Sequence, residues 1–301
     1  MEKIQRNYQD IIFNVLVYIF VGLVLLSVLY PLIYILSASI SSPQSVNSGQ
    51  MLLWPKEITW EGYRLIFANQ AIWRGYLNTI LYTVTGTLIN LAFTLPAGFA
   101  LSRHDFPARN FFTQFIIVTM FVSGGLIPSY ILITNLGLTD TIWAMVLPGA
   151  VSVYNLIVVR SYFESSIPEE LIESAVVDGA SYFDIFRLII LPLSKPIIAV
   201  MALFYGIGHW NQFFNALLYL NDRDKYPLQM ILREILVIQD MSSNPNLNVT
   251  GEMAEFIYSQ QQLGQVIKYG VMIVSALPII IIYPFLQRYF VKGVMVGAIK
   301  G

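Results

Sequence analysis

The feature that most constrains this chain is a series of stretches, each about 20 residues long, that contain almost no charged side chains. A helix rises about 1.5 Å per residue, so a stretch of that length crosses a hydrocarbon core roughly 30 Å thick. Only 12% of all residues are charged, against about 25% in a typical soluble domain, and 56% are hydrophobic. The sequence therefore predicts an integral membrane protein of the all-α class.

Six apolar stretches predict a polytopic helix bundle with six transmembrane helices. They are Ile11–Leu36, Asn78–Leu101, Phe111–Thr134, Thr141–Ser161, Leu193–Leu220 and Val266–Tyr289. The first stretch is longer than the roughly 7–15 apolar residues of a signal-peptide core and has no convincing cleavage site, so we interpret it as an uncleaved span. Outside the spans, the apolar residues of Tyr226–Gln239 also recur at helical spacing.

The distribution of Lys and Arg predicts which side of the membrane each connection faces. Ten of the 17 basic residues lie in the N-terminal tail, in loop 102–110, in segment 160–195 and from Arg288 to the C-terminus. Since cytoplasmic segments are enriched in Lys and Arg, both termini are predicted to be cytoplasmic. The resulting division is a cytoplasmic tail (1–10), a first span (11–36), an extracytoplasmic loop (37–77), a core permease domain of five helices (78–290) with cytoplasmic helices at 166–191, and a second cytoplasmic tail (291–301).

Several function classes are excluded by what the sequence lacks. There is no Cys, and the only histidines, His104 and His209, lack metal-ligand spacing, so no metal site is predicted. The net charge of −1 argues against a nucleic-acid partner. The sequence has no Walker A, His-Glu-x-x-His or Gly-x-Ser-x-Gly motif. We therefore expect a non-enzymatic chain that binds no cofactor itself.

Residues 166–191 are polar and rich in acids, although they lie between two apolar stretches. Ser166 and Glu169 have the spacing of a capping box at the start of a helix. Asp178-Gly179 predicts its end, because glycine readily adopts the left-handed conformation of a helix C-terminus. Ser181 predicts the start of a second helix, and Leu191-Pro192 predicts its end, because the residue before proline avoids the helical conformation. The segment therefore predicts a helical hairpin exposed between two spans, suited to docking another protein.

At this point the chain resembles a known family. One segment is similar to the EAA motif of ABC importer permeases, with Ser174 at the position of the motif's first alanine. It comprises Glu173-Ser174-Ala175-Val176-Val177-Asp178-Gly179-Ala180, followed by Phe186 and Leu191-Pro192-Leu193. Asn78-Thr79, Ala97–Ser102 and Trp210–Phe213 resemble the carbohydrate-uptake branch. Within the carbohydrate-uptake branch, the chain resembles the oligosaccharide and lipoprotein-type permeases, including those for pectin or alginate fragments. The segments that carry this resemblance are Gly125–Thr134, Trp210–Leu220 and Tyr289–Gly301.

The resemblance implies a type I ABC importer fold in a bacterial cell membrane, with the helical hairpin as coupling helices. It implies partners: a second, non-identical permease, two copies of an ATP-binding subunit that hold ATP and Mg²⁺, and an extracytoplasmic solute-binding protein. The cargo it implies is an oligosaccharide. The candidate ATPase-coupling residues are Glu173, Ala175, Asp178, Gly179, Ala180, Phe183 and Phe186.

Polar side chains within the spans are candidates for the substrate path, because a polar group in hydrocarbon normally faces a partner or water. Aromatic faces and amides suit sugars, whose C–H faces pack on rings while their hydroxyls pair with Asn and Gln. The equally plausible alternative is hydrogen bonding between helices. The candidates are Tyr205, His209, Trp210, Asn211, Gln212 and Asn215 in the fifth span, and Tyr154 and Asn155 in the fourth.

Two alternatives to an oligosaccharide permease are a secondary transporter and an ABC permease for another cargo. A secondary transporter would show intramembrane acids and an inverted internal repeat, and neither is found in the sequence. An ABC permease for peptides, amino acids or ions differs only in cargo, and only the fifth-span and C-terminal resemblances argue against it.

Overall fold

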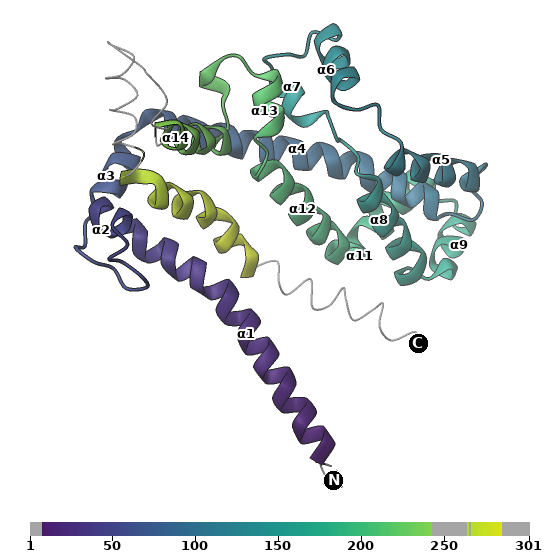
Figure 1. Cartoon of the computed structure of the whole chain (residues 1–301). Helices are drawn as coiled ribbons and strands as arrows, with labels where there is room; N and C mark the ends of the chain where they lie inside the picture. Colours follow the sequence, from purple (N-terminus) through teal and green to yellow (C-terminus); the bar gives the residue numbers. More distant parts are fainter. Residues whose placement is uncertain (1–7, 243–263, 265, 285–301) are drawn as a thin grey trace. The chain divides into compact units, whose positions relative to one another are not determined.

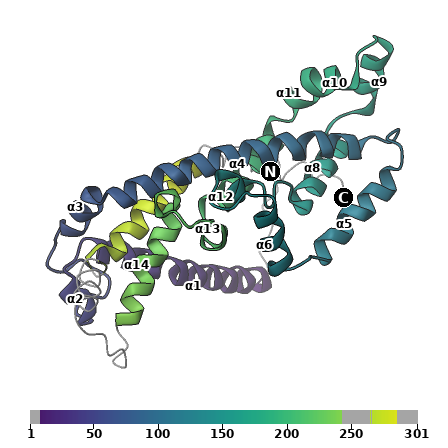
Figure 2. The same cartoon turned by 90° about the horizontal axis from the view of Figure 1, so that it is seen from above.

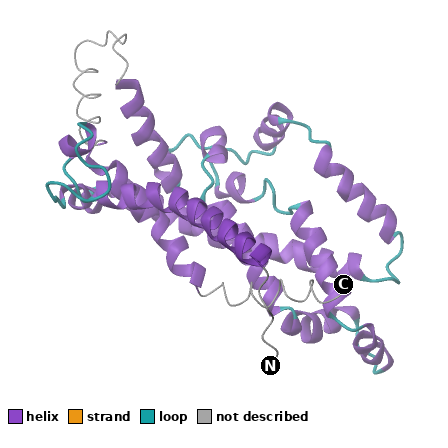
Figure 3. Ribbon diagram, turned by 60° about the horizontal axis from the view of Figure 1, so that its bottom comes forward, coloured by secondary structure: helices purple, strands orange, loops and turns teal. Residues whose placement is uncertain are grey.

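The structure is a computed structural model that describes residues 8–242, 264 and 266–284. Within those residues all regular structure is helical and no strand occurs (Figure 3), as the predicted all-α class requires. The longer helices are α1 (Tyr8–Ser39), α4 (Gln70–Ser102), α5 (Arg109–Phe121), α6 (Leu126–Asn135), α8 (Val153–Ser166), α9 (Glu169–Val177), α12 (Lys195–Trp210), α14 (Leu228–Ser242) and Val266–Pro284. The shorter ones are α2 (Pro43–Asn47), α3 (Glu61–Ala68), α7 (Ile142–Val146), α10 (Tyr182–Ile185), the π-helix η1 (Phe186–Ile190), α11 (Leu191–Leu193), α13 (Phe214–Tyr219) and the 3₁₀ helix η2 (Arg223–Lys225).

The chain forms two compact units. One comprises residues 1–69 and 232–276, and the other comprises residues 70–231 and 277–301. In the first unit α1 exposes nearly all of its apolar side chains over residues 8–36. A helix that is apolar on every side fits a lipid environment. Near its end, Ala38, Val46 and Met51 form a small buried cluster that includes α2.

The second unit is built around α4, which carries α8 and α12 against it (Figure 1). Glycine permits this close packing. A Cβ atom on Gly98 of α4 would lie 2.6 Å from Cγ1 of Val159 on α8, so any side chain there would force the helices apart or Val159 to repack. In Figure 2, α9, α10 and α11 lie together beside the end of α4.

Among the described residues, three single helices are long and apolar enough to cross a membrane: α1, α4 and Val266–Pro284. Two bent pairs also qualify, α5 with α6 at 111° and the α10–α11 segment with α12 at 82°. The six-span count is thus approximately reproduced, but α4 begins eight residues before the predicted Asn78. The tail 291–301 and residues 285–289 of the predicted sixth span lie outside the described residues.

Three predicted spans are broken helices. The third carries Gly124, Gly125 and Pro128, which predict its interruption, but the breaks in the fourth and fifth are a correction to the sequence prediction. The third divides into α5 and α6, the fourth into α7 and α8, and the fifth into α12 and α13. The break before α6 includes Gly125 with φ of 84°, and the break before α8 includes Gly149 with φ of 80°. An apolar stretch predicts the length of chain within a membrane, but not whether its helix is continuous. The prediction of a helix within Tyr226–Gln239 is confirmed by α14.

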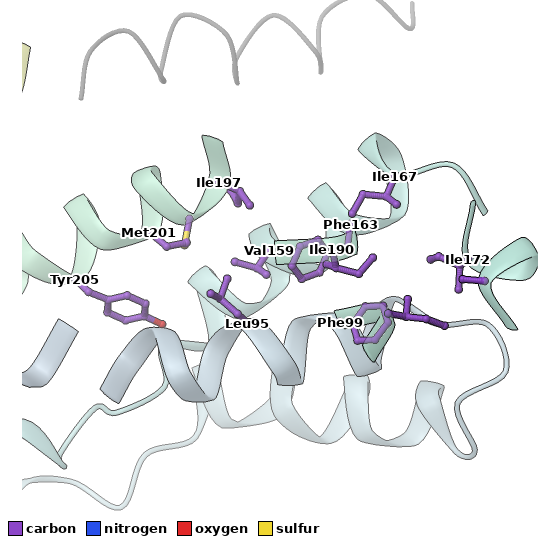
Figure 4. Close-up of a cluster of buried hydrophobic side chains, with 12 residues drawn as sticks. Leu95, Phe99, Val159, Phe163, Ile167, Ile172, Ile190, Ile197, Met201 and Tyr205 are labelled. Carbon is purple, nitrogen blue, oxygen red and sulfur yellow. The ribbon is translucent and has the colours of Figure 1, made fainter. Parts of the chain in front are cut away.

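The main hydrophobic core joins α4, α8 and α12 to the segment that follows α8 (Figure 4). Leu95 and Phe99 come from α4, and Val159 and Phe163 from α8. Ile172 and Ile190 reach the same core from α9 and η1. The predicted hairpin therefore rests on the helix bundle and does not stand free of it.

Candidate functional site

The first candidate site is the helical insert, residues 166–191. Its central turn forms a Schellman motif. Gly179 has φ of 84°, its N–H donates to the carbonyl of Val176 at 3.0 Å, and the N–H of Ala180 donates to the carbonyl of Ala175 at 2.9 Å. These bonds satisfy carbonyls that the end of α9 leaves free. The predicted stop at Asp178-Gly179 is confirmed.

The predicted start of the second insert helix is also confirmed. The Ser181 side chain accepts a hydrogen bond from the N–H of Asp184 at 3.2 Å, as an N-cap does. With the glycine turn directly before it, this cap determines how the chain passes from α9 to α10.

Two details of the predicted hairpin are wrong. Ser166 is the last residue of α8, so its backbone is helical, and α9 has Pro168 at its N-cap without a side-chain bond. The second helix also continues through Leu191-Pro192 to Leu193. The π-helical turn η1 widens the helix just before Pro192, where a regular turn would bring the proline ring against the carbonyl of Leu188.

The predicted coupling residues divide into two groups in the structure. Glu173, Asp178, Gly179 and Phe183 are exposed, and Phe183 is 68% accessible. Ala175, Ala180 and Phe186 instead pack on the main core. The exposed group adjoins Val177, which the sequence analysis did not select and which is 87% accessible. The insert thus combines a buried base with an outer face of acids and apolar side chains.

Loop 102–110 supports the base of the insert through polar contacts. Arg103 Nη2 donates to Glu169 Oε1 at 3.3 Å, and the Tyr182 hydroxyl donates to the carboxylate of Asp105. The bond from Tyr182 holds the pKa of the Asp105 carboxyl below its usual value, and the nearby Arg103 acts in the same direction. Sequence analysis missed these supports, because contacts between segments about 70 residues apart leave no local pattern.

The second candidate site is a cavity of about 360 Å³ beside α4, α8 and α12. Polar and apolar side chains both line it, and it is called the polar cavity because of its amides and its histidine. It forms where two helices are interrupted: between α7 and α8, and between α12 and α13. Non-helical backbone at membrane depth is tolerated where it lines a cavity. The polar lining residues are Asn90, Ser152, Asn155, Tyr205, His209, Asn211 and Gln212, and the ring-bearing ones include Phe204, Phe213 and Phe214.

His209 lies at the centre of the polar contacts of this cavity. Its Nε2 is 2.7 Å from Oδ1 of Asn90, and its Nδ1 is 3.3 Å from Oε1 of Gln212. The Asn90 amide donates to the carbonyls of Gly149 at 3.1 Å and Ala150 at 2.8 Å. Asn90 thereby satisfies backbone groups that the interruption before α8 leaves free.

Tyr205 of α12 connects its helix to α4 and to the residue that precedes α8. Its hydroxyl lies 2.8 Å from Thr94 Oγ1 on α4 and accepts a hydrogen bond from the N–H of Ser152 at 3.2 Å. The residue is buried, so its hydroxyl serves to join the helices that form the wall of the cavity.

The structure brings together five of the eight predicted substrate-path residues: Tyr205, His209, Asn211, Gln212 and Asn155. Trp210, Asn215 and Tyr154 do not line the polar cavity. Trp210 lines a separate apolar cavity of about 380 Å³ and packs edge-on against Tyr76 with ring centroids 5.6 Å apart.

Sequence analysis missed Asn90 and Ser152 in the lining. Asn90 is a lone amide in an otherwise apolar part of its span, and an intramembrane polar residue was the signal available to find it.

Comparison with known proteins identifies the fold. The family of binding-protein-dependent transport system inner membrane components matches residues 66–296. The chain belongs to this family. It is 38% identical over 290 residues to Protein LplC of Bacillus subtilis, covering 96% of this chain and 95% of that protein. It is 35% identical to the polygalacturonan/rhamnogalacturonan transport system permease protein YtcP of the same organism, covering 96% and 99%.

A solved structure is similar over nearly the whole chain. It is a crystal structure of a bacterial ABC transporter involved in the import of the acidic polysaccharide alginate. The TM-score is 0.83 at 34% identity, covering 94% of this chain and 98% of the other. The predicted fold class, an all-α polytopic membrane bundle like that of type I ABC importers, is therefore confirmed. The predicted family, a carbohydrate-uptake ABC importer permease, is confirmed as well.

Proposed function

We propose that this chain forms part of the translocation path of an ATP-driven importer for an oligosaccharide, with acidic fragments of pectin or alginate as the favoured cargo. The observation that carries the proposal is the similarity, at a TM-score of 0.83, to a chain of a bacterial ABC transporter involved in the import of alginate. The name of the relative YtcP points to the same chemical class. The polar cavity supports it, since rings with neighbouring amides suit a sugar.

The proposed assembly contains a second, non-identical permease, two copies of an ATP-binding subunit and an extracytoplasmic solute-binding protein. ATP and Mg²⁺ are held by the ATP-binding subunits, and this chain is not itself an enzyme. The helical insert then faces the cytoplasm, with both termini on the same side. Its exposed acids argue against the insert lying flat on a membrane, because interfacial helices are usually rich in Lys and Arg.

In the proposed mechanism the insert transmits movement from the ATP-binding subunits to the bundle. Closure of those subunits around ATP displaces the exposed face around Glu173 and Phe183. The buried base, with Ile172 and Ile190 in the core of α4 and α8, transfers the displacement to the helices. The bundle then opens outward and receives the sugar from the binding protein, as alternating access requires.

The coupling role is tested by replacing Gly179 with valine. A Cβ there meets no atom within 4 Å, so the cost is backbone strain at φ of 84°, about 1–3 kcal/mol, confined to the turn. Gly137→Val is the matched control, because Gly137 has φ of 66° and equally open surroundings but lies outside the insert. Both variants are co-purified from native membranes in mild detergent and assayed for uptake.

Gly179→Val should insert in the membrane yet lose the ATP-binding subunit and uptake, whereas Gly137→Val should keep both. Equal retention of the subunit by the two variants would refute the docking role. Cargo is tested separately by uptake of tri-galacturonate into proteoliposomes that hold the whole assembly and its binding protein. Uptake of peptides or ions without oligosaccharide uptake would refute the cargo assignment.

A further inference from the structure

His209 lies between the side-chain amides of Asn90 and Gln212, which differ in their freedom to turn. In the positions observed, both ring nitrogens face amide oxygens: Nε2 faces Asn90 Oδ1 at 2.7 Å and Nδ1 faces Gln212 Oε1 at 3.3 Å. A neutral imidazole has one donor and one acceptor nitrogen, whereas an imidazolium has two donors. The observed arrangement therefore satisfies the imidazolium fully, and the neutral ring only if one amide turns over.

Asn90 is held in its orientation by the backbone. Its Nδ2 donates to the carbonyls of both Gly149 and Ala150. Turning its amide would place Oδ1 against two carbonyl oxygens, which cannot donate, and would leave those carbonyls unsatisfied. The Asn90 oxygen is thus fixed toward His209, and His209 Nε2 carries a hydrogen in either charge state.

Gln212 is the amide that can turn. Its side chain lines the cavity at the interruption between α12 and α13. With an imidazolium, Gln212 accepts the Nδ1 hydrogen through its oxygen and presents its NH₂ group to the cavity. With a neutral ring, its NH₂ donates to Nδ1 and its oxygen faces the cavity instead.

The imidazole lies directly against the backbone of α4, because a Cβ atom on Gly86 would lie 2.4 Å from His209 Nε2. Among the described residues that line the cavity, Tyr205 is the other ionisable group, and α4, α7 and α8 contribute no charged side chain to the lining. Protonation of His209 is thus the event that changes the charge of this wall.

We propose that Asn90, His209 and Gln212 form a proton-dependent selector for the sugar in the polar cavity. In the neutral state Gln212 offers an oxygen, which accepts from a sugar hydroxyl. After His209 takes a proton from water in the cavity, Gln212 offers N–H donors and the wall carries a positive charge, which suits the carboxylate of a uronic acid. This inference rests on the proposed function and names Asn90 as the residue that positions His209.

The test compares two probes, tri-galacturonate and its uncharged counterpart tri-galactose, in proteoliposomes holding the complete transporter with saturating binding protein. Uptake is measured between about pH 5 and 8, the range in which histidine changes charge. For wild type, the ratio of charged to neutral uptake should rise roughly fivefold to tenfold toward the acidic end, as expected for a gained charge-assisted hydrogen bond. Because all variants share one binding protein, its own preference cancels.

Three variants separate the selector from general damage to the cavity. His209→Gln should give a ratio that does not change with pH. Gln212→Glu keeps the shape but offers no donor to the cavity, so it should remove the rise in the ratio of charged to neutral uptake toward acidic pH. Asn211→Ala alters a lining residue outside the selector, and its ratio of charged to neutral uptake should still follow pH as in wild type.

A wild-type ratio independent of pH, or a His209→Gln ratio that changes as in wild type, would overturn the selector while leaving the transport function standing. If wild type takes up neither probe, the oligosaccharide assignment fails first and the selector fails with it.

Discussion

The ring of Phe186 packs against the ring of Phe99 on α4, with the two centroids 5.6 Å apart. Phe186 begins the π-helical turn of the insert, so this contact joins the insert to the longest helix of its unit. Phe183, only three residues earlier, is 68% accessible. Two phenylalanines of one short segment thus face opposite directions, one toward the bundle and one outward.

The different positions of the two rings predict different effects when each phenylalanine is replaced by alanine. Phe186→Ala should destabilise the protein by about 2–4 kcal/mol, because it removes a ring from the core against Phe99. Phe183→Ala should leave thermal unfolding in detergent nearly unchanged but weaken retention of the ATP-binding subunit. A loss of stability in Phe183→Ala equal to that in Phe186→Ala would contradict the orientation described here.

Close packing of α4 on α8 gives a second prediction. Gly98→Ala introduces a Cβ atom 2.6 Å from Val159 Cγ1, so the helices must move apart or Val159 must repack, at a cost of about 1–3 kcal/mol. Gly22→Ala on α1 is the control, since a Cβ there meets nothing within 4 Å. Thermal unfolding should separate the two variants, and equal stability would argue against this helix contact.

The bonds of Tyr205 give a third prediction. Tyr205→Phe removes the partner of Thr94 and the acceptor for the Ser152 N–H, and should cost about 1–2 kcal/mol. Thr94→Val should cost less, because Tyr205 then still accepts from Ser152. In the double variant the effects should not add, since both remove one shared bond. A larger loss for Thr94→Val than for Tyr205→Phe would show that the hydroxyl is not the junction.

Local features of the insert could be predicted from sequence, because glycine at a helix end and serine at a helix start act within a few residues. Gly179 and Ser181 behave as predicted for this reason. Ser166 does not, since the same residue types also suit the last turn of a helix that continues from the membrane. Local chemistry names the possible boundaries, and the packing of α8 selects between them.

The polar cavity could be predicted only in part. His209 and Gln212 lie three residues apart, and their segment attracts attention by its polarity. Asn90 meets His209 across 119 positions of sequence, so no spacing rule connects them. The breaks in the fourth and fifth predicted spans, which border this cavity, were missed because an apolar stretch looks the same whether its helix is straight or broken. The sequence also could not separate Trp210 from its neighbour, because His209 lines one cavity while Trp210 lines the other.

An ion pair outside the spans gives the last prediction. Lys225 Nζ lies 2.8 Å from Asp140 Oδ2, and Asp140 also accepts from the backbone N–H groups of Asn221 and Asp222 at 3.1 Å. The bond from Lys225, followed by the backbone bond from Asp222, lowers the pKa of the Asp140 carboxyl from its ordinary value of 3.8. The same pair raises the pKa of Lys225.

Because the pKa of Asp140 is lower in the folded state, its contribution to stability is present above the pKa of the unfolded chain, about 3.9, and is lost as the pH falls through the folded value. The contribution of Lys225, with its raised pKa, is present throughout neutral pH and is lost only under strongly alkaline conditions.

Asp140→Asn keeps the oxygen that accepts from Asn221 and tolerates the positive φ of 60° at this position. Wild type should therefore have the higher Tm at pH 7. The difference should begin to shrink below about pH 4, where the unfolded chain takes up a proton, and should vanish only below the lowered pKa of the folded carboxyl. A Tm difference that persists unchanged at pH 3 would mean that the charge of Asp140 does not stabilise this connection.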